Sequence, residues 1–369
     1  MVELSGKKRL RATFRSHLPF HPGWIGIVIS LPLLILSVSC SGSSGTLDRT
    51  GSVSAPAEPS GIYRNHANST IVSNQIRESF QSIKRVQATL YYRTYHFGED
   101  NLPTHSDLRQ MPPEELAVEF TSDNHSVTGT AVAVTRTRNA FLLLTAAHIV
   151  TAPDTLWHYV DPSEPAESRA IEAVSVKVRS TYLLIGSDFV LPFNIVSMDE
   201  QRDLALLSVP LNGVNPARLK ALEILAGDSD DLQWGDMVYT IGFPKGNRMI
   251  TTGVISRPEW TPGNRFIIDS SFNRGFSGGV VLAVRNRPSG LEWVGMLISV
   301  SAESEYLLTP GSMTADEFQP ELPYNDPAFV ERFIRINYGI GYMIGITEII
   351  SFFRENRDEI LQVGFLPPM

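Results

Sequence analysis

The chain has 369 residues, of which 43% are hydrophobic and 19% are charged. These proportions are those of a globular protein and exclude a chain that is disordered throughout. Its formal net charge of −8 argues against a nucleic-acid partner, because proteins that bind nucleic acid neutralise phosphates with lysine and arginine.

The first forty residues predict an export leader. Lys7, Lys8 and Arg9 belong to a basic segment, and residues 24–39 form an uncharged, mostly apolar run shorter than the ~20 residues of a membrane span. The run ends in LSVSC, which resembles a bacterial lipoprotein processing site. This resemblance implies export to the bacterial cell envelope, in the periplasm or at the surface, with a lipid anchor at Cys40. An uncleaved signal anchor is the alternative interpretation.

Cys40 is the single cysteine, so a disulfide and a thiolate metal site are not expected in the folded part. Residues 41–74 are rich in Ser, Gly and Pro and predict a flexible linker, because such a composition buries too little apolar area to offset its ordering entropy. Residues 75–362 are expected to form the folded domain.

The domain begins with a predicted helix over residues 75–85, where Ile76, Phe80 and Ile83 recur at helical spacing. After this helix, short β-prone segments follow one another, separated by Gly, Pro and Asn, with almost no helical period between them. This pattern indicates antiparallel barrels or sandwiches rather than a parallel α/β sheet. The segments are residues 88–92, 129–134, 140–144, 204–209, 238–241, 266–268, 280–284 and 293–300.

Two long polar stretches that contain proline, residues 97–125 and 302–335, interrupt the strand pattern. Insertions of this length predict lids, binding loops or disordered surface segments. The last predicted element is a helix over residues 348–362, capped by Thr347. Its apolar face contains Ile349, Ile350, Phe353 and Ile360.

A histidine follows the apolar run FLLL at residues 141–144, which is typical of a buried strand. Because His148 lies at the end of this strand, it is expected where the core meets a cleft, and a neutral imidazole there can act as a base. Taken alone, a structural histidine held by hydrogen bonds is the simpler interpretation. The small residues at 145–147 favour the base, since they leave room for close packing around the ring.

An aspartate opens the apolar strand at residues 204–209. The charge of Asp203 is costly to bury unless the carboxylate accepts hydrogen bonds, and a histidine N–H is one such donor. Taken alone, a turn aspartate that faces water is the simpler interpretation. Asp199 and Glu200 are weaker candidates, because no apolar strand follows either of them directly.

Residues 275–279 read GFSGG. Gly275 permits a left-handed backbone, so that the N–H groups of Gly275 and Ser277 can converge on one oxygen; a glycine-rich turn that happens to contain serine is the alternative. The sequence also fits the Gly-x-Ser-x-Gly elbow of esterases and lipases. That order needs a histidine after the serine, and the last histidine of the chain is His158, so it is excluded.

A histidine, an aspartate and a serine in this order resemble the chymotrypsin-like serine proteases, and most closely the bacterial HtrA-type branch. The resemblance covers roughly residues 75–360, although only short segments match closely. Those segments are TAAH at 145–148, DLALL at 203–207, and residues 235–244, 251–256, 269–279 and 339–344.

The resemblance implies an all-β fold of two antiparallel six-stranded β-barrels, followed by the C-terminal helix. The first barrel would span residues 86–215 and the second residues 225–346. The active site would lie in the cleft between the barrels, with His148 and Asp203 from the first barrel and Ser277 from the second.

By the same resemblance, the protein is a serine endopeptidase that cuts protein or peptide substrates through an acyl-enzyme, without a metal or other cofactor. His148, Asp203 and Ser277 would form the catalytic triad, and the Gly275 and Ser277 N–H groups the oxyanion hole. The primary substrate pocket would contain no acidic residue, so an apolar side chain is expected before the cut. Its lining would be Ser271, Ile298, Ser299, Val300 and Met343.

The chain departs from the family pattern at two positions of the serine segment. Phe276 stands where related proteases carry aspartate or asparagine, and Arg274 replaces a usual proline. A catalytically impaired pseudoprotease or chaperone-like peptide-binding module on the same fold is therefore a second hypothesis. An adhesion or scaffold protein and a metal-dependent hydrolase are weaker ones. No room is expected for the PDZ domain that often follows HtrA-type proteases, and the oligomeric state is left open.

Overall fold

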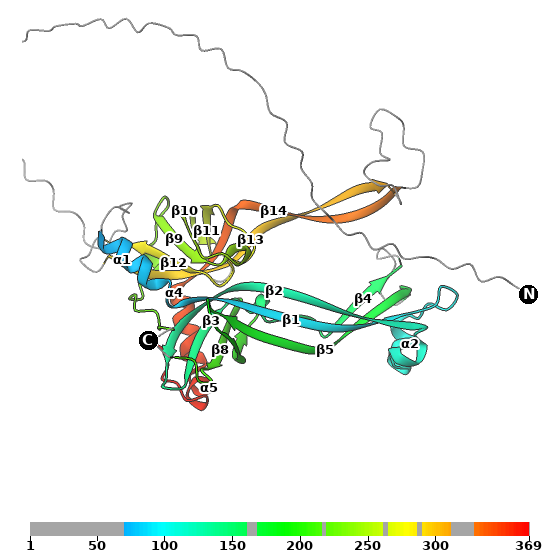
Figure 1. Ribbon diagram of the computed structural model, residues 1–369. Helices are drawn as coiled ribbons and strands as arrows, with labels where there is room; N and C mark the ends of the chain where they lie inside the picture. Colours follow the sequence, from blue (N-terminus) through cyan, green and yellow to red (C-terminus); the bar gives the residue numbers. More distant parts are fainter. Residues whose placement is uncertain are drawn as a thin grey trace, which may run out of the picture. The chain divides into compact units, whose positions relative to one another are not determined.

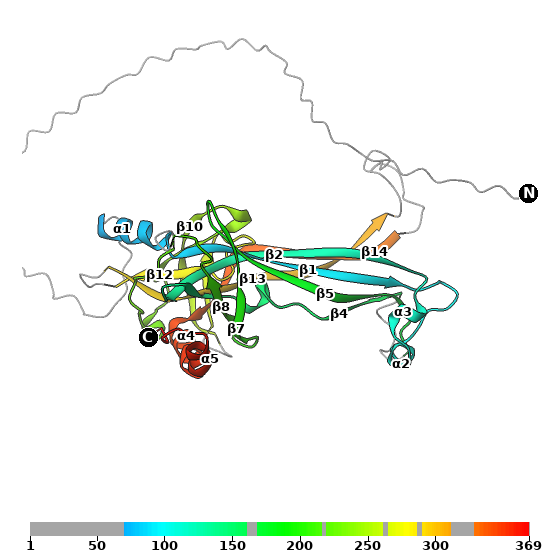
Figure 2. The same cartoon turned by 60° about the horizontal axis from the view of Figure 1, so that its bottom comes forward.

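The computed structural model describes residues 70–160, 168–215, 219–260, 265–285, 290–310 and 328–368 (Figures 1 and 2). The predicted export leader, the lipidation site at Cys40 and most of the predicted linker lie outside these residues. Predictions about them therefore remain predictions. Among the described residues, no helix combines the length and the apolar character that crossing a membrane requires.

The N-terminal half is an antiparallel sheet of eight strands, which curls into a half-barrel. Its order is β4-β5-β1-β2-β3-β8-β7, and β6 pairs with β5. The strands are β1 (Ile83–His96), β2 (Glu119–Arg136), β3 (Ala140–Thr145), β4 (Thr155–Tyr159), β5 (Ile171–Ile185), β6 (Val190–Pro192), β7 (Asn194–Asp199) and β8 (Leu204–Pro210).

The C-terminal half is a closed six-stranded barrel with the order β10-β11-β14-β13-β12-β9. Its pairs are antiparallel. The strands are β9 (Met237–Gly242), β10 (Met249–Trp260), β11 (Arg265–Ser270), β12 (Val280–Val284), β13 (Leu291–Pro310) and β14 (Ala328–Gly345).

The predicted all-β fold of two antiparallel halves followed by a helical end is confirmed. The halves differ in detail from two equal barrels, because the first is an open eight-stranded sheet. Its additional strands β4 and β6 both pair with the long strand β5. Strands β4 and β6 therefore supply hydrogen-bond partners for backbone groups of β5.

One buried apolar cluster joins the two halves. Val86 and Leu144 of the first sheet belong to the same cluster as Ile241 and Val280 of the barrel, and all four side chains are fully buried. Strand β3 is buried on both faces, which explains its continuous apolar sequence FLLL. Because each such side chain contributes about 1.5–3 kcal/mol on burial, this shared core holds the two halves in place.

The predicted N-terminal helix is displaced along the chain. Helix α1 spans Thr70–Ser79, and Ile83 already begins strand β1, paired with Val132 of β2. A turn ends the helix, in which the Gln81 N–H donates to the Glu78 carbonyl. The prediction of helix through residue 85 was wrong, because the helical spacing of Ile76 and Phe80 continued by chance into a strand whose pairing is long-range.

Paired strands form part of both insertions. Strands β1 and β2 remain paired as far as His96 and Glu119, and β13 and β14 as far as Pro310 and Ala328 (Figure 1). The intervening residues of the first hairpin contain α2 (His105–Gln110) and α3 (Pro113–Leu116). The described parts of both stretches therefore contain regular secondary structure, which differs from disordered segments; a role as lids or binding loops stays a prediction, and residues 311–327 lie outside the described part.

The polar sequence of β2 explains why its first part escaped detection. Residues 119–126 are exposed throughout, so the apolar–polar alternation that marks a half-buried strand is absent. Their backbone groups are nevertheless paired with β1 along the whole segment. Backbone pairing, which leaves no trace in side-chain periodicity, makes this segment a strand.

The C-terminal helix consists of two pieces, α4 (Ile346–Glu355) and α5 (Arg357–Gln362), with a break at Asn356. Its N-cap is Gly345 and not the predicted Thr347, whose hydroxyl lies 2.9 Å from the hydroxyl of Ser229. At the break, the Asn356 amide donates to the Phe352 carbonyl. The predicted apolar face is buried at three of its four positions, Ile349, Phe353 and Ile360, while Ile350 is half-buried.

Candidate active site

His148 lies directly after the buried strand β3, in the 3-10 turn η1 (Ala147–Ile149). The flanking Ala147 and Ile149 are buried, whereas the imidazole of His148 is 44% exposed. The buried strand thus places His148 at the edge of the core, where its side chain contacts both protein and solvent.

Asp203 holds this histidine through both of its carboxylate oxygens. The backbone N–H of His148 donates to Oδ1 at 2.8 Å, and His148 Nδ1 lies 2.7 Å from Oδ2. Because an ionised carboxylate only accepts hydrogen bonds, the proton of the neutral ring is on Nδ1. The remaining nitrogen, Nε2, is then an unprotonated base.

The backbone of Asp203 adopts a left-handed conformation, with φ of 60°, immediately before β8. Aspartate tolerates this conformation better than most residues, and such outliers cluster at functional sites. The Asp203 carbonyl also accepts the Ala147 N–H at 3.1 Å. Backbone and side chain of one aspartate therefore fix the position of the turn that carries His148.

Asp199, the neighbouring acidic candidate, has a different partner. It accepts hydrogen bonds from the backbone N–H and the Nε of Arg202, the latter at 2.6 Å. Partial burial acts to raise the pKa of Asp199, but the backbone and side-chain hydrogen bonds from Arg202 outweigh it and lower this pKa. Arg202 also pairs with Glu355 of α4. This carboxylate thus serves an ion-pair network and not the histidine.

The loop that carries Ser277 depends on two glycines with positive φ, Gly275 at 105° and Gly278 at 81°. A Cβ at Gly275 would collide with the Phe243 carbonyl oxygen, and one at Gly278 with the Thr130 carbonyl oxygen. Only glycine fits such a close backbone approach together with this conformation. The GFSGG sequence is therefore required by the packing of the loop.

The N–H groups of Gly275 and Ser277 donate no hydrogen bond to any residue that the structure describes. The carbonyl of Arg274 accepts the Lys245 N–H at 3.0 Å, which turns this carbonyl toward Lys245. Since the N–H of a trans peptide points opposite to its carbonyl, the Gly275 N–H points away from Lys245. Two open donors two residues apart can bind an oxyanion.

Phe276 anchors the loop from within the barrel. Its side chain is fully buried and packs edge-to-face on Phe272, with ring centroids 5.8 Å apart. Burial of an aromatic ring thus supplies the support at the position where related proteases use a polar residue. Arg274 is exposed, so its side chain does not fill the loop.

Thr130 of β2 joins the two halves beside the serine. Its N–H donates to the Ser277 carbonyl at 2.8 Å, and its hydroxyl donates to the Gly275 carbonyl at 2.7 Å. The same hydroxyl accepts the Phe243 N–H, and the Thr130 carbonyl accepts the hydroxyl of Thr145, three residues before His148. Sequence analysis missed this residue, because a buried threonine in a strand carries no local signal.

Gly129 packs between the turn that carries His148 and the loop that carries Ser277. A Cβ at Gly129 would collide with Ile149, the neighbour of His148, and would lie 3.1 Å from the Ser277 carbonyl oxygen. Among the described residues, no hydrogen bond joins the Ser277 hydroxyl to His148. The structure thus brings the two segments together through Gly129 and Thr130, while the hydroxyl itself forms no hydrogen bond within the described part.

The residues predicted for the primary pocket differ in exposure. Ser271 is exposed and Ser299 half-buried, whereas Ile298 and Met343 are buried. Met343 belongs to the apolar cluster of the barrel together with Phe272. The side chain of Val300 lies outside the described part. Which of these residues would contact a substrate stays a prediction.

A groove of about 1230 Å³ begins at His148 and extends over the first sheet. Its floor is formed by alternate residues of neighbouring strands, such as Tyr92 and the paired Asp123, and Thr94 and the paired Ser175. Further lining residues include Leu90, Phe97, Leu102, Val127, Thr151, Pro153, Leu156 and Val160. Strands β1, β2, β4 and β5 therefore line a largely apolar groove beside the histidine.

Comparison with protein families gives one match. Residues 128–291 match the family model described as a trypsin-like peptidase domain. No curated protein matches the chain. The matched segment contains His148, Asp203 and Ser277, and it supports a chymotrypsin-like serine protease. No group of three or more potential metal ligands is present among the described residues.

Proposed function

We propose, on the premise that residues 128–291 form a trypsin-like peptidase domain, that the protein is a serine endopeptidase of the HtrA type. Its triad would be His148, Asp203 and Ser277. The proposal rests on the two contacts of Asp203 with His148, in which its carboxylate oxygens lie 2.8 Å from the backbone nitrogen and 2.7 Å from Nδ1. The neighbouring serine loop has two open N–H donors.

In the proposed reaction, His148 Nε2 accepts the proton of the Ser277 hydroxyl while the serine oxygen bonds to the scissile carbonyl carbon. The carbonyl oxygen becomes an oxyanion and binds the N–H groups of Gly275 and Ser277. The imidazolium then donates its proton to the leaving amine as the peptide bond breaks. Water deacylates the enzyme by the same route in reverse, so that His148 and Ser277 are regenerated.

The free hydroxyl of Ser277 suits this mechanism. Because no described residue binds it, the side chain can change rotamer without breaking a hydrogen bond, and catalytic contacts commonly tighten only when substrate is bound. Asp203 keeps the ring in the required tautomer throughout, and it stabilises the imidazolium that forms.

The leaving segment of the substrate is assigned to the groove at His148. Since His148 protonates the leaving amine, the residues that follow the scissile bond must pass this side chain. The groove that begins there is lined by residues of four neighbouring strands, and its volume of about 1230 Å³ would hold part of an extended peptide. An apolar residue before the cut remains part of the proposal, supported by the sequence resemblance.

A peptide library tests this substrate assignment. Peptides that share one sequence before the cut but have five residues after it are expected to be cleaved at least about tenfold faster, in kcat/KM, than peptides with one. An apolar residue is expected immediately before the cut. Equal rates for both lengths would contradict the role of the groove, and a profile dominated by basic residues would contradict the apolar pocket.

The second candidate is an impaired protease that binds peptides without cutting them. It was suggested by Arg274 and Phe276, but Phe276 supports the loop by burial and the Arg274 carbonyl is turned toward Lys245. Both observations favour a competent oxyanion site. Anchoring at the cell envelope through a lipid on Cys40 also remains part of the proposal, supported by the leader sequence alone.

Active-site labelling separates the two candidates. A fluorophosphonate is expected to modify the full chain at a single serine, identified as Ser277 by mass spectrometry of the digested protein, because only a base-activated hydroxyl attacks it. A Ser256→Ala variant, which lacks a half-buried serine of the same barrel, should label at the unchanged rate. Absence of labelling in folded protein, or labelling spread over several serines, would favour the impaired protein.

A further inference from the structure

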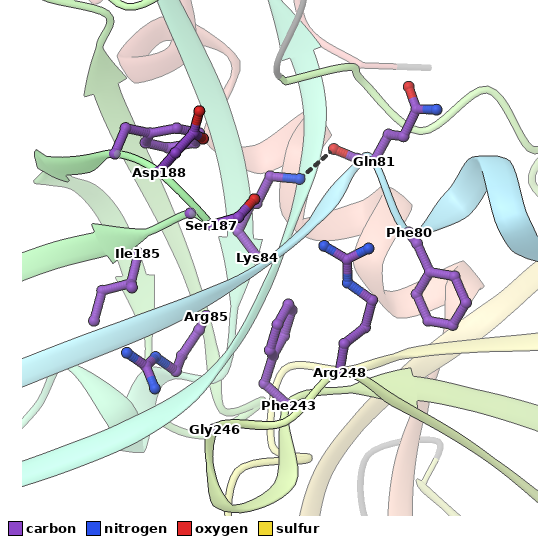
Figure 3. Close-up of a pocket in the computed structure, with 12 residues that line it drawn as sticks. Phe80, Gln81, Lys84, Arg85, Ile185, Ser187, Asp188, Phe243, Gly246 and Arg248 are labelled. Atoms are coloured by element: carbon purple, nitrogen blue, oxygen red, sulfur yellow. Dashed lines mark hydrogen bonds between the residues drawn. The ribbon is translucent and has the colours of Figure 1, made fainter.

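A second cavity, of about 890 Å³, lies away from the groove at His148. The start of β1, the turn between β5 and β6, and the segment from Phe243 to Arg248 form its walls. Figure 3 shows its lining side chains, which include Phe80, Lys84, Arg85, Asp188, Phe243 and Arg248. No residue of the proposed triad contributes to it.

Positive charge dominates this cavity, in a chain whose net charge is negative. Lys84, Arg85 and Arg248 line it, and none of the three forms an ion pair with a described residue. Asp188 is the only carboxylate among the described lining residues. Three cations and one carboxylate leave the cavity with a net positive charge, which a bound anion would balance.

Two of the three cations are held in the protein rather than in solvent. The side chain of Lys84 is 6% exposed and donates to the Gln81 carbonyl at 2.6 Å, as Figure 3 shows. The Nε of Arg85 is fully buried and has no hydrogen-bond partner among the described residues. A buried guanidinium nitrogen without an acceptor is costly, because buried donors are normally paired.

Burial and the nearby charge of Arg248 lower the pKa of Lys84 to about 8. The direction of this shift shows that the surroundings of the ammonium group do not compensate its charge. An anion placed between Lys84 and Arg248 would raise the pKa of Lys84 again. It would replace the hydration that the ammonium group loses on burial, and it would screen the charge of Arg248.

Three aromatic rings also line the cavity. Phe80, Phe189 and Phe243 line it, and the guanidinium of Arg248 lies over the rings of Phe80 and Phe243, 5.5 and 5.9 Å from their centroids. A ligand that fits must therefore present an apolar group to the rings and acceptor oxygens to the cations. Inorganic ions satisfy only the second requirement.

We propose that this cavity binds a small organic oxyanion, in which a phosphate or carboxylate group carries an apolar or aromatic substituent. The oxyanion would bind Arg248 and Lys84, and the substituent would pack on phenylalanine rings that line the cavity. Phosphate and carboxylate share this chemistry, because both present several acceptor oxygens to guanidinium groups. The proposal does not depend on peptidase activity.

Titration calorimetry of the full chain tests the proposal with phenyl phosphate, 3-phenylpropionate, inorganic phosphate and the neutral benzyl alcohol. One or both organic anions are expected to bind at least tenfold more tightly than inorganic phosphate, and benzyl alcohol should not bind measurably. The tighter of the two anions identifies the preferred oxyanion. Binding of benzyl alcohol as tight as that of the anions, or no binding of either anion at millimolar concentration, would overturn the proposal.

Two variants locate the binding. Arg248→Gln is expected to lower the affinity for the preferred anion at least tenfold. Arg138→Gln, which changes an exposed arginine in the β2–β3 turn, should bind this anion with unchanged affinity. Arg248 is itself exposed, so its replacement leaves the core intact; thermal melting of both variants checks this. Equal affinity of wild type and Arg248→Gln would overturn the assignment to this cavity.

The pH dependence offers a separate readout. The charged groups that face the cavity are Lys84 and Arg85 from β1, Asp188 from the β5–β6 turn, and Arg248. Of these, Lys84 loses its proton as the pH rises through about 8, so the affinity should fall between pH 7 and pH 9.5. Lys84→Met should remove this dependence. Affinity that is unchanged between the two pH values in the wild type would contradict a contact with Lys84.

Discussion

Replacement of Ser277 by alanine is expected to abolish proteolysis while leaving the fold unchanged. Hydrolysis of denatured casein by the purified full chain should fall by ~10⁴-fold or more, because the substitution removes the proposed nucleophile. Such a loss corresponds to more than about 5 kcal/mol of transition-state stabilisation.

Stability should be nearly unaffected by this substitution. The Ser277 hydroxyl forms no hydrogen bond with a described residue, and the contacts of the loop run through its backbone, such as the bond from the Thr130 N–H. A melting temperature within about 2 °C of the wild type is therefore expected. Ser256→Ala provides the matched control for activity. Residual casein hydrolysis above a few per cent in Ser277→Ala would exclude this serine as the nucleophile.

Asp203→Asn is expected to lower kcat/KM by about 10⁴-fold, although asparagine has the same shape. Asparagine can still accept the His148 N–H through its amide oxygen, and it tolerates the left-handed backbone with φ of 60°. Its NH₂ group would then face Nδ1, where the carboxylate oxygen now lies at 2.7 Å. The ring proton would move to Nε2, and the imidazole could no longer accept the proton of Ser277.

Asp199→Asn is the control that distinguishes this effect from a general loss of negative charge. Asp199 is bound to Arg202, so its neutralisation should weaken that ion pair and change kcat/KM by less than about tenfold. Both variants are compared with the same peptide at saturating and subsaturating concentrations. A larger loss in Asp199→Asn than in Asp203→Asn would show that the histidine is not oriented by Asp203.

The two segments that matter most for the proposed chemistry are recognisable in the sequence because each is local. The apolar run before His148 reflects the burial of β3 on both faces, and GFSGG reflects two backbone positions that only glycine can occupy. Burial and backbone conformation of a short segment leave their mark in the residues of that segment. The all-β class follows in the same way from strand-length apolar runs and turn residues.

Features that depend on pairing between distant segments were not predictable. The first part of β2 is polar and exposed, and it is a strand only because β1 supplies its hydrogen bonds. Thr130 bridges both halves of the molecule, but nothing in its neighbourhood distinguishes it from any other strand threonine. The helix predicted through residue 85 failed for the same reason, since Ile83 pairs with Val132.

By itself, the sequence determined the class of the fold, the order of the three candidate side chains and the need for glycine around Ser277. Only the tertiary structure showed that Asp203 contacts His148 through both carboxylate oxygens, that the Gly275 N–H is left open, and that Lys84, Arg85 and Arg248 line one cavity. The physical reason is that propensity and burial act over a few residues, whereas these contacts join segments up to about 160 residues apart, and their geometry is set by strand register and by packing of the shared core.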